Sequence, residues 1–544
     1  MSAEPQNLHQ LLGRSVEKYG DRIALITEDR RINYSGLSAM VDRYARSLVA
    51  QGVGKGSRLG LLMENSPEWI AMAFAATGIG AIFVPISTFV KPQDLAFQLK
   101  HADISHLFLN RSFLNSNYLE MVGEVVPEIH TAGSAPLHFN SMPCLRHITV
   151  MGEGDIPLAV HSWESFEQAA EAIPETLLQP LREQLDGEDD CYMLSTSGTT
   201  SQPKGVLQTH RAVARNGWLI GEYQQLECED VCWFYFPLFF SAGCINVLLG
   251  TLSHGAALIV HSNFEAESAL RMIEQEKATT WHLFPPTLKK MMDHPDWHSR
   301  DHSSMYKGTV PYDVFLERMS ATGLGGVNMY GMTETCTAFT CTRADDAPEI
   351  RVNTQGGLMP ENALKIVDPE TGETLEVGVE GEICVKGPSV MRRYYKLPPE
   401  DYFDKDGFFH TGDLGKTDSD GRLMFGQRAK DMIKSGGINI SPAEIEEKLG
   451  TLDGVAGAYA FPVPSEEKDE VVGLALALEP GSQPLEKSLI AGFCKENLPG
   501  YKHPCAVLFL REEDVPMTGS GKVQKNQIKD RFIAAYDRDE LLRL

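Results

Sequence analysis

Apolar residues recur at helical and strand spacings in alternation along most of the chain. After Ser35, a predicted N-cap, they recur every three or four residues until Gly52, which predicts a helix. Ser66-Pro67 opens another helix, a third begins near His210, and residues 265–277 have the same spacing. Short apolar runs predict strands at residues 59–63, 82–86, 191–194, 231–236, 257–260 and 279–283. Strands separated by helices predict right-handed crossovers and mostly parallel sheets.

The pattern changes after residue 364. Strand-like runs at 364–367 and 381–385 are separated by Gly and Pro turns, which is typical of a small β-rich subdomain. Beyond Arg428, a helix opens at Ser441-Pro442, and strand-like runs follow near 456–461 and 471–478. We therefore expect a large domain at residues 1–428 and a smaller α+β domain at residues 429–544, which is close to the usual domain size.

Composition and charge narrow the functional classes. Of the 544 residues, 42% are hydrophobic and 23% are charged, as in an ordinary globular protein. The formal net charge of -25 argues against nucleic acid as a partner, because that binding depends on Lys and Arg that neutralise phosphates. The longest apolar stretch, residues 69–87, contains Gly78, Gly80 and Pro85. It predicts a buried helix, a turn and a strand, so we expect no integral membrane segment.

The ten cysteines are scattered, and no pair has Cys-x-x-Cys spacing. We expect buried free thiols rather than zinc ligands or disulfides, and a reduced, cytoplasmic setting. The sequence does not decide between a monomer and a homodimer.

A segment rich in Ser, Thr and Gly carries the clearest chemistry. Residues 194–205 read LSTSGTTSQPKG, and the small residues let the backbone close around phosphate oxygens while Lys204 adds a positive charge. A Walker loop requires Gly-Lys followed by Ser or Thr, which is absent here. A flexible surface loop would not explain the Pro203-Lys204-Gly205 ending. The candidate phosphate-binding residues are Thr196, Ser197, Gly198, Thr199, Thr200 and Lys204.

This segment resembles the phosphate-binding signature of the adenylate-forming superfamily, which includes acyl-CoA synthetases, peptide-synthetase adenylation domains and firefly-type luciferases. Ser201 stands where that family usually has Gly. The resemblance implies an α/β fold with two mostly parallel sheet subdomains, a small β-barrel-like subdomain and a mobile, smaller α+β C-terminal domain. It also implies ATP as substrate and a Mg²⁺ ion, for which Glu334 and Thr200 are the candidate ligands.

Tyr330-Gly331-Met332-Thr333-Glu334 resembles the central motif of the same family. By this resemblance Tyr330 stacks on adenine, Thr333 contacts the α-phosphate region and Glu334 holds Mg²⁺. The chemistry agrees, because a carboxylate beside phosphates is costly without a cation. Upstream, Val310 resembles part of the wall of the adenine pocket, and Asn328 stands at a position that is often polar in the family. Ordinary packing explains Val310 and Asn328 equally well.

Three later segments resemble family motifs in the expected order. They lie at residues 410–413, 426–431 and 516–525. The resemblance implies that Asp413 accepts hydrogen bonds from the ribose hydroxyls and that Arg428 binds ribose or phosphate. Lys430 would be the hinge of the C-terminal domain. Lys522 would stabilise charge on the α-phosphate as the substrate carboxylate attacks, and a cation in that position contributes about 10²–10³ in rate.

The segment Phe236-Pro237-Leu238-Phe239-Phe240-Ser241 resembles the part of the family that lines the acyl site, where many relatives have His at the position of Phe240. Peptide-synthetase relatives place an Asp nearby for the substrate's amino group, and its absence disfavours an amino-acid substrate. The candidate wall residues, some of which could equally be core, are Phe236, Phe240, Ser241, Gly325, Gly326, Met332 and Cys336. Small apolar walls suit an aliphatic, alicyclic or aromatic acid.

Ser435-Gly436-Gly437 resembles the loop that faces the pantetheine tunnel in acyl-CoA ligases, which favours coenzyme A as the acceptor. The resulting hypothesis is an AMP-forming acyl-CoA ligase that makes an acyl-adenylate and then a thioester. Three alternatives stay open: an acyl-AMP ligase that loads a carrier-protein phosphopantetheine, a luciferase-like oxygenase, and a nucleotide-binding regulator without catalysis.

Overall fold

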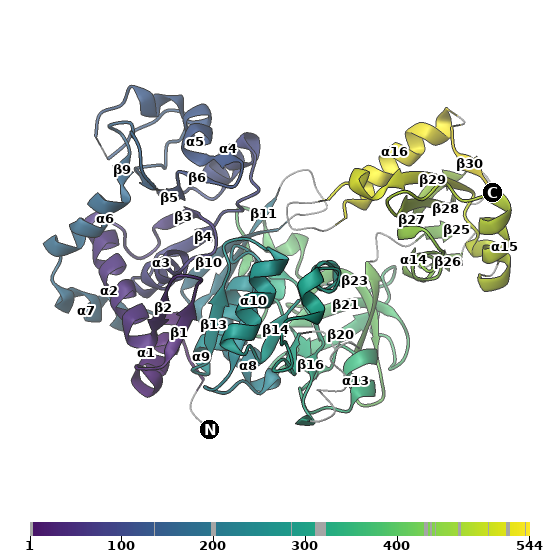
Figure 1. The fold of residues 1–544 in the computed structure, drawn as a ribbon, viewed down its shortest axis with the longest axis horizontal. Helices are drawn as coiled ribbons and strands as arrows, with labels where there is room; N and C mark the ends of the chain where they lie inside the picture. The colour runs from purple at the N-terminus through teal and green to yellow at the C-terminus, as the bar shows by residue number, and fades with distance from the viewer. Residues whose placement is uncertain are drawn as a thin grey trace. The chain divides into compact units, whose positions relative to one another are not determined.

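The computed structural model describes most of the chain. It does not describe residues 1–3, 135, 197–202, 284, 310–321, 429–432, 436–437, 441, 466–468, 499, 518–522 and 539, or the side chains of 285–286, 427–428, 434, 438–439, 469, 501 and 537. The chain forms two compact units (Figure 1). One unit comprises residues 1–365, 384–410 and 417–424, and the other comprises 366–383, 411–416 and 425–544.

An eight-stranded sheet has the strand order β22-β11-β10-β4-β3-β5-β8-β9 and is parallel from β10 to β9. Its strands are β3 (Arg58–Leu62), β4 (Ile82–Pro85), β5 (His106–Asn110), β8 (His147–Met151), β9 (His161–Ser162), β10 (Asp190–Thr196), β11 (Lys204–Thr209) and β22 (Arg393–Tyr394). Successive side chains enter different cores because strand residues alternate between faces. Leu61 packs with α2 (Tyr34–Ala50), α3 (Pro67–Gly78) and α6 (Trp163–Ala169), whereas Leu62 packs with α4 (Pro92–His101) and α5 (Tyr118–Val125).

A second, seven-stranded sheet has the order β16-β15-β14-β12-β13-β1-β2 and is parallel except at its β1–β2 edge. Its strands are β1 (Ile23–Ile26), β2 (Arg31–Asn33), β12 (Val231–Phe234), β13 (Ala257–Val260), β14 (Thr280–His282), β15 (Lys307–Thr309) and β16 (Gly326–Val327). One face packs against α1 (Leu8–Tyr19), α8 (His210–Gln224) and α9 (Leu248–Ser253). The other face packs against α10 (Ala266–Glu276) and α11 (Pro285–Met292).

The smaller elements build the rest of the chain. A three-stranded sheet joins β17 (Met329–Tyr330), β18 (Thr340–Cys341) and β19 (Gly357–Leu358). A two-stranded sheet joins β6 (Ser112–Phe113) and β7 (Ser116–Asn117). A four-stranded sheet joins β20 (Ala363–Val367), β21 (Gly381–Lys386), β23 (Phe409–Thr417) and β24 (Leu423–Arg428). Short helices lie at α7 (Leu178–Glu183) and α13 (Pro348–Asn353).

The C-terminal part is an α+β arrangement around a six-stranded sheet, drawn in yellow-green in Figure 1. The strands are β25 (Ile433–Ser435), β26 (Ile438–Ile440), β27 (Val455–Ser465), β28 (Asp469–Leu478), β29 (Ala506–Arg511) and β30 (Leu542–Arg543). One face packs against α14 (Pro442–Leu449) and α15 (Lys487–Asn497), and the other packs against α16 (Lys525–Asp537). The predicted fold class, with two mostly parallel sheets followed by a smaller α+β domain, is confirmed.

The predicted elements fit the structure closely, with one corrected cap. α2 begins at Tyr34 and its N-cap is Asn33, not Ser35. Asn33 is extended at the end of β2, and its side-chain oxygen accepts a hydrogen bond from the Gly36 N–H (2.8 Å). The helix therefore starts two residues earlier than predicted.

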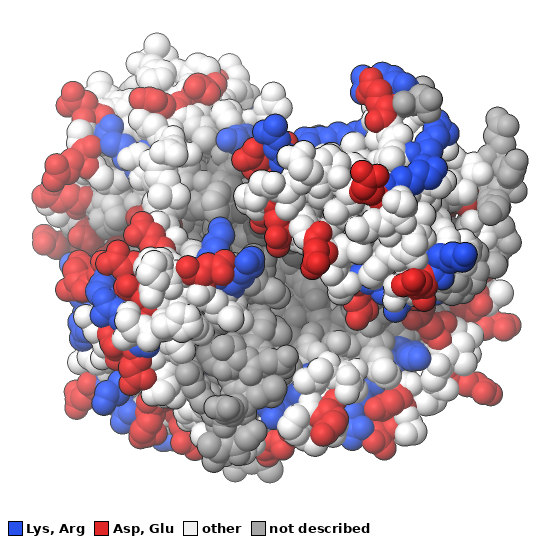
Figure 2. Space-filling view, turned by 45° about the vertical axis from the view of Figure 1, so that its right-hand side comes forward, with Lys and Arg blue, Asp and Glu red and all other residues white. Residues whose placement is uncertain are grey.

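The long apolar stretch forms α3 and β4, as predicted, and every residue of α3 except Glu68 is buried. Among the described residues, no helix is long and apolar enough to cross a membrane. All ten cysteines are free thiols, and seven of them are buried. Acidic and basic side chains are interspersed on the face shown in Figure 2.

Three histidine rings stack where β5, β8 and β9 begin. The His106 and His147 ring centroids are 4.8 Å apart, and those of His147 and His161 are 5.7 Å apart. Burial, reinforced by the two neighbouring histidines, lowers the pKa of His147 to about 4. Histidine in an unfolded chain titrates near 6.5, at about the model-peptide value, so the unfolded state binds more protons between these two values.

We therefore expect the free energy of unfolding to fall as the pH drops from about 7 to 5, by about 1 kcal/mol from His147. His147→Gln should flatten this dependence, whereas replacement of the exposed His138 by Gln should not. Urea midpoints at several pH values measure the difference, and equal slopes for both variants would contradict the prediction.

Candidate active site

The predicted phosphate-binding segment connects two antiparallel strands. β10 ends at Thr196 and β11 begins at Lys204, and these residues are paired across the hairpin. β11 was not predicted from the sequence. Ser197, Gly198, Thr199 and Thr200 lie outside the described residues. The Thr196 hydroxyl oxygen is buried and has no hydrogen-bond partner within the described part of the chain, as a group that receives a phosphate oxygen would.

Lys204 and Glu334 both contact Tyr394. The Lys204 Nζ is 4.6 Å from the centroid of the Tyr394 ring, and the Tyr394 hydroxyl donates a hydrogen bond to Glu334 Oε1 (2.7 Å). Tyr394 belongs to β22, which pairs with β11, and its N–H donates to the Tyr402 hydroxyl (3.0 Å). Tyr394 was missed by the sequence analysis, since nothing in the sequence indicates that β22 would join β11.

Glu334 itself is only 8% exposed. Its backbone oxygen accepts a hydrogen bond from the Met391 N–H (2.6 Å). The segment that supplies Tyr394 therefore also holds the main chain of Glu334. A buried carboxylate requires donors or cations around it, and carboxylates are preferred ligands of Mg²⁺. The donor set therefore fits the predicted metal-binding role, while the other predicted ligand, Thr200, lies outside the described residues.

Two buried amides hold the turn at residues 333–338. Gln208 on β11 donates to the Thr333 carbonyl (2.7 Å) and accepts from the Cys336 thiol (3.0 Å). Asn216 on α8 donates to the carbonyls of Cys336 (2.7 Å) and Ala338 (2.8 Å). These bonds give buried carbonyls of the turn side-chain donors. They fix Thr333 and Glu334 to the same strand that begins with Lys204.

The backbone of the central motif is tightly constrained. A Cβ on Gly331 would lie 2.2 Å from the Thr337 carbonyl oxygen, so no larger residue fits there. Cys336 and Thr337 have φ values of 49° and 75°, which are costly for residues other than glycine. Strain of this kind is common at functional turns.

The predicted adenine residues lie just before this turn. Tyr330 is buried on β17, and its carbonyl accepts a hydrogen bond from the Phe339 N–H (2.8 Å). The Asn328 amide is used internally: it donates to the Thr354 carbonyl (3.0 Å) and accepts from the Met329 N–H (3.0 Å). Val310 lies outside the described residues.

Several predicted acyl-site residues form one aromatic group. Phe236 and Phe240 stack with ring centroids 4.9 Å apart, and Phe239 lies 4.4 Å from Phe240. The Ser241 hydroxyl is 3.4 Å from the Thr333 hydroxyl, so this group reaches the central motif. A π-helix follows at Ala242–Val247, a rare conformation that is frequent at functional sites.

The other predicted acyl-site residues are less directly connected to this aromatic group. Cys336 is fully buried and bonded to Gln208, as a core residue would be. The Met332 N–H donates to the Thr335 hydroxyl (2.9 Å). Gly325 and Gly326 are buried at β16, where the Gly325 N–H donates to the Ala344 carbonyl (3.0 Å).

The remaining predicted site residues belong to the second unit. Asp413 is 4% exposed on β23, and its N–H donates to the Thr411 hydroxyl (3.1 Å). Arg428 ends β24, and its side chain is not described. Ser435 is buried at the end of β25. Three further sets lie outside the described residues: the hinge Lys430, the glycines Gly436 and Gly437, and the catalytic candidate Lys522.

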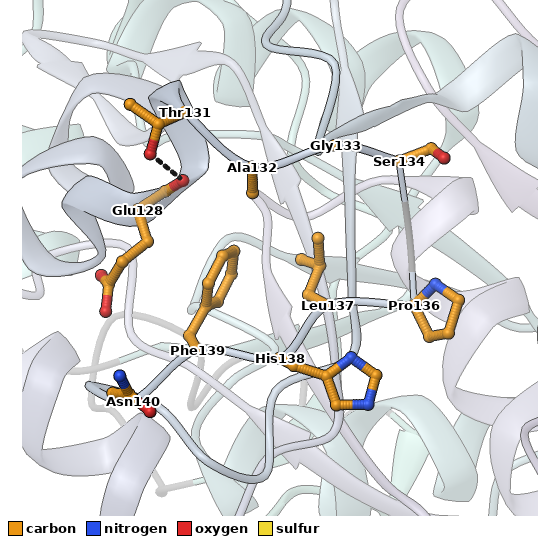
Figure 3. Close-up of a pocket in the computed structure, with 10 residues that line it drawn as sticks. All are labelled: Glu128, Thr131, Ala132, Gly133, Ser134, Pro136, Leu137, His138, Phe139 and Asn140. Atoms are coloured by element: carbon orange, nitrogen blue, oxygen red, sulfur yellow. Dashed lines mark hydrogen bonds between the residues drawn. The ribbon is translucent and has the colours of Figure 1, made fainter.

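A pocket of about 240 Å³ lies elsewhere, between Glu128 and Asn140 (Figure 3). Its lining includes Leu137, His138 and Phe139, and Glu128 bonds to Ser141 rather than to any predicted site residue. None of the residues predicted for ATP, acid or CoA lines it, so we do not assign it to the reaction.

Comparisons with known proteins agree with this architecture. The AMP-binding enzyme family model matches residues 12–395, and the AMP-binding enzyme C-terminal domain model matches residues 444–522. A Bacillus subtilis protein named as an acyl-CoA synthetase, YngI, is 32% identical over 97% of this chain and 98% of its own length. The indoleacetate–CoA ligase of Aromatoleum aromaticum is 32% identical over 93% of this chain and 94% of its own length.

A solved structure of ATP-bound MatB from Rhodopseudomonas palustris superposes with a TM-score of 0.80, at 25% identity, over 97% of this chain and 100% of that one. The chain belongs to the AMP-binding enzyme family, the adenylate-forming superfamily that its motifs indicate. It is an enzyme of the AMP-forming acid–CoA ligase group within that family.

Tyr394→Phe tests whether the Tyr394–Glu334 bond matters. Loss of a hydrogen bond to a carboxylate costs about 1.5–3 kcal/mol, so we expect adenylate formation to slow by about 10- to 100-fold. The adjacent Tyr395 is a matched control, because its hydroxyl donates to Asp103 (2.6 Å), away from this turn. Pyrophosphate release measures both variants, and equal rates for Tyr394→Phe and Tyr395→Phe would contradict the expectation.

Proposed function

We propose that this ligase joins a hydrophobic carboxylic acid, aliphatic, alicyclic or aromatic, to coenzyme A through an acyl-adenylate. The observation that carries the proposal is that Tyr394 contacts both Lys204 and the buried Glu334. Ser241, which follows the Phe236–Phe240 stack, approaches the neighbouring Thr333. A phosphate-binding lysine, a buried carboxylate and an apolar aromatic group in one unit suit a reaction between a nucleotide and an apolar acid.

In the first step, a carboxylate oxygen attacks the α-phosphorus of ATP, the bond to the β-phosphate oxygen breaks, and pyrophosphate leaves. We assign the phosphates to Lys204 with residues 196–200 and the α-phosphate region to Thr333. Tyr330 is assigned to adenine, and Asp413 with Arg428 to the ribose. A Mg²⁺ ion held by Glu334 and Thr200 would neutralise phosphate charge. Lys522 would stabilise the charge that builds up as the carboxylate attacks.

In the second step, the thiol of coenzyme A loses its proton and attacks the acyl carbon, and AMP leaves. We assign residues 1–428 to ATP and acid binding and residues 429–544 to a mobile domain that turns about Lys430. Ser435, Gly436 and Gly437 would then face the thiol. Such a turn would withdraw Lys522 after adenylation and protect the reactive acyl-adenylate from water.

The aromatic group is the basis for the proposed class of carboxylic acid. Phe236, Phe239 and Phe240 offer rings but no charged or polar edge, and Phe240 stands where many relatives have His. An apolar acyl group buries surface against these rings at about 25 cal/mol per Å². A relative named as an indoleacetate–CoA ligase is consistent with an aromatic or similarly sized acid.

Pyrophosphate release across a panel of carboxylic acids, each with and without coenzyme A, tests the proposal. We expect release that is sustained only with coenzyme A, together with an acyl-CoA thioester detected by mass spectrometry. Release that stops after about one turnover despite coenzyme A would point instead to a carrier protein as acceptor. Oxygen consumption or light with an accepted acid would point to an oxygenase.

Lys522→Ala should slow adenylate formation by about 10²–10³, because the positioned cation is lost. The same variant should still convert a supplied acyl-adenylate to the thioester, since Lys522 is not assigned to the second step. Lys525→Ala is the control in the same segment, because Lys525 forms an ion pair with Glu446 (2.6 Å). Equal loss of both steps in Lys522→Ala would remove the assigned role.

A further inference from the structure

The buried end of β14 carries a histidine that the proposed reaction does not use. His282 is the last residue of this strand and is only 5% exposed. Within the described part of the chain, neither of its ring nitrogens has a hydrogen-bond partner. Leaving buried polar atoms unpaired is costly, so the two nitrogens without a partner need an explanation.

The position of His282 in the sheet is that of a ligand-binding residue. β14 lies between β12 and β15, all three strands are parallel, and His282 is paired with Thr309 at the end of β15. In open α/β sheets, ligands bind beyond the carboxyl ends of parallel strands. The segment with Phe236 and Phe240 leaves β12 at this same edge.

The alternation of side chains places His282 on the face that this aromatic segment covers. Its neighbour Trp281 packs in the core with α10 and α11, on one face of the sheet. His282 therefore points to the opposite face, which it shares with Phe234. Phe234 packs in the core with Leu238 and Cys244, and a Cβ on Gly243 would lie 3.1 Å from its ring.

The chemistry of the His282 ring suits a neutral partner. Burial alone lowers the pKa of His282 to about 3, so the ring is uncharged near neutral pH. A neutral imidazole offers one N–H donor and one acceptor nitrogen. It therefore matches a hydroxyl or a ketone oxygen better than a second carboxylate, which would call for a cation.

A second buried histidine shows what an internally satisfied ring looks like here. His261, which follows β13, is 7% exposed, and its Nε2 accepts a hydrogen bond from the Trp233 indole N–H (3.0 Å). Burial also lowers the pKa of His261, to about 4. His261 is thus matched to His282 in burial but has a partner within the chain.

We propose, on the basis of the ligase function proposed above, that His282 is a specificity-determining residue that hydrogen-bonds an oxygen atom within the acyl group of the substrate. The preferred acid is then a hydrophobic acid with one internal hydroxyl or ketone oxygen, rather than a pure hydrocarbon acid. A site built to pair with such an oxygen rejects the analogue that lacks it, because its own polar group is left unpaired.

The test compares octanoate with a series of oxo-octanoates in which the ketone moves one carbon at a time along the chain. For the wild-type protein we expect kcat/KM of adenylation to be about 10-fold or more higher for the best oxo isomer than for octanoate. His282→Phe should remove this preference and leave kcat/KM for octanoate within a few-fold of wild type. His282→Gln, which keeps a donor and an acceptor, should retain part of the preference, and His261→Phe should retain all of it.

Three results would overturn the proposal: no preference in the wild type, an unchanged preference in His282→Phe, or an equal loss for both acids in that variant. An ATP-induced rise in Tm verifies that each variant is folded. If His282→Phe does not fold, His282→Leu replaces it in the same comparison. Thioester formation from octanoate by the wild type tests the ligase function separately, so its failure is distinguishable from the absence of an oxygen preference.

Discussion

A carboxylate buried inside a protein requires hydrogen-bond donors and rigid surroundings, and the larger unit provides both for Glu334. Tyr394 donates to the carboxylate from β22, Met391 holds the main chain, and Lys204 lies across the Tyr394 ring. β22 is in position only because it adds to β11, and β11 only because it folds back on β10. The hairpin that brackets the phosphate-binding segment is thus also the support of the acidic residue.

The turn that carries Thr333 and Glu334 depends on amides from two other elements. Gln208 and Asn216 are fully buried, and together they bond to Thr333, Cys336 and Ala338. Replacing such residues by apolar ones would leave several carbonyls unpaired in the core. The positive φ values at Cys336 and Thr337 are maintained by this network, so the site is pre-organised before any ligand binds.

The aromatic segment links this rigid turn to the seven-stranded sheet. Ser241 approaches Thr333, while Phe236 and Phe240 stack beyond the end of β12. His282 ends the neighbouring strand on the same face. Its buried ring has no hydrogen-bond partner among the described residues, unlike the satisfied amides around the turn. An unpaired buried polar group at the edge of the sheet where the aromatic segment begins directs attention to the substrate.

The sequence by itself determined the fold class, most elements and the motifs, because these depend on local periodicity and on short segments of contiguous residues. α3 begins after Ser66, α10 spans nearly the predicted residues, and β13 has the predicted bounds. The N-cap of α2 was predicted at Ser35 instead of Asn33 because both are good capping residues, and the end of β2 decides between them. Only the tertiary structure brought Tyr394 to Glu334, Gln208 to Cys336 and His282 to the aromatic face. Those contacts join residues that are far apart in the chain, and a sequence pattern contains no information on which strands become neighbours.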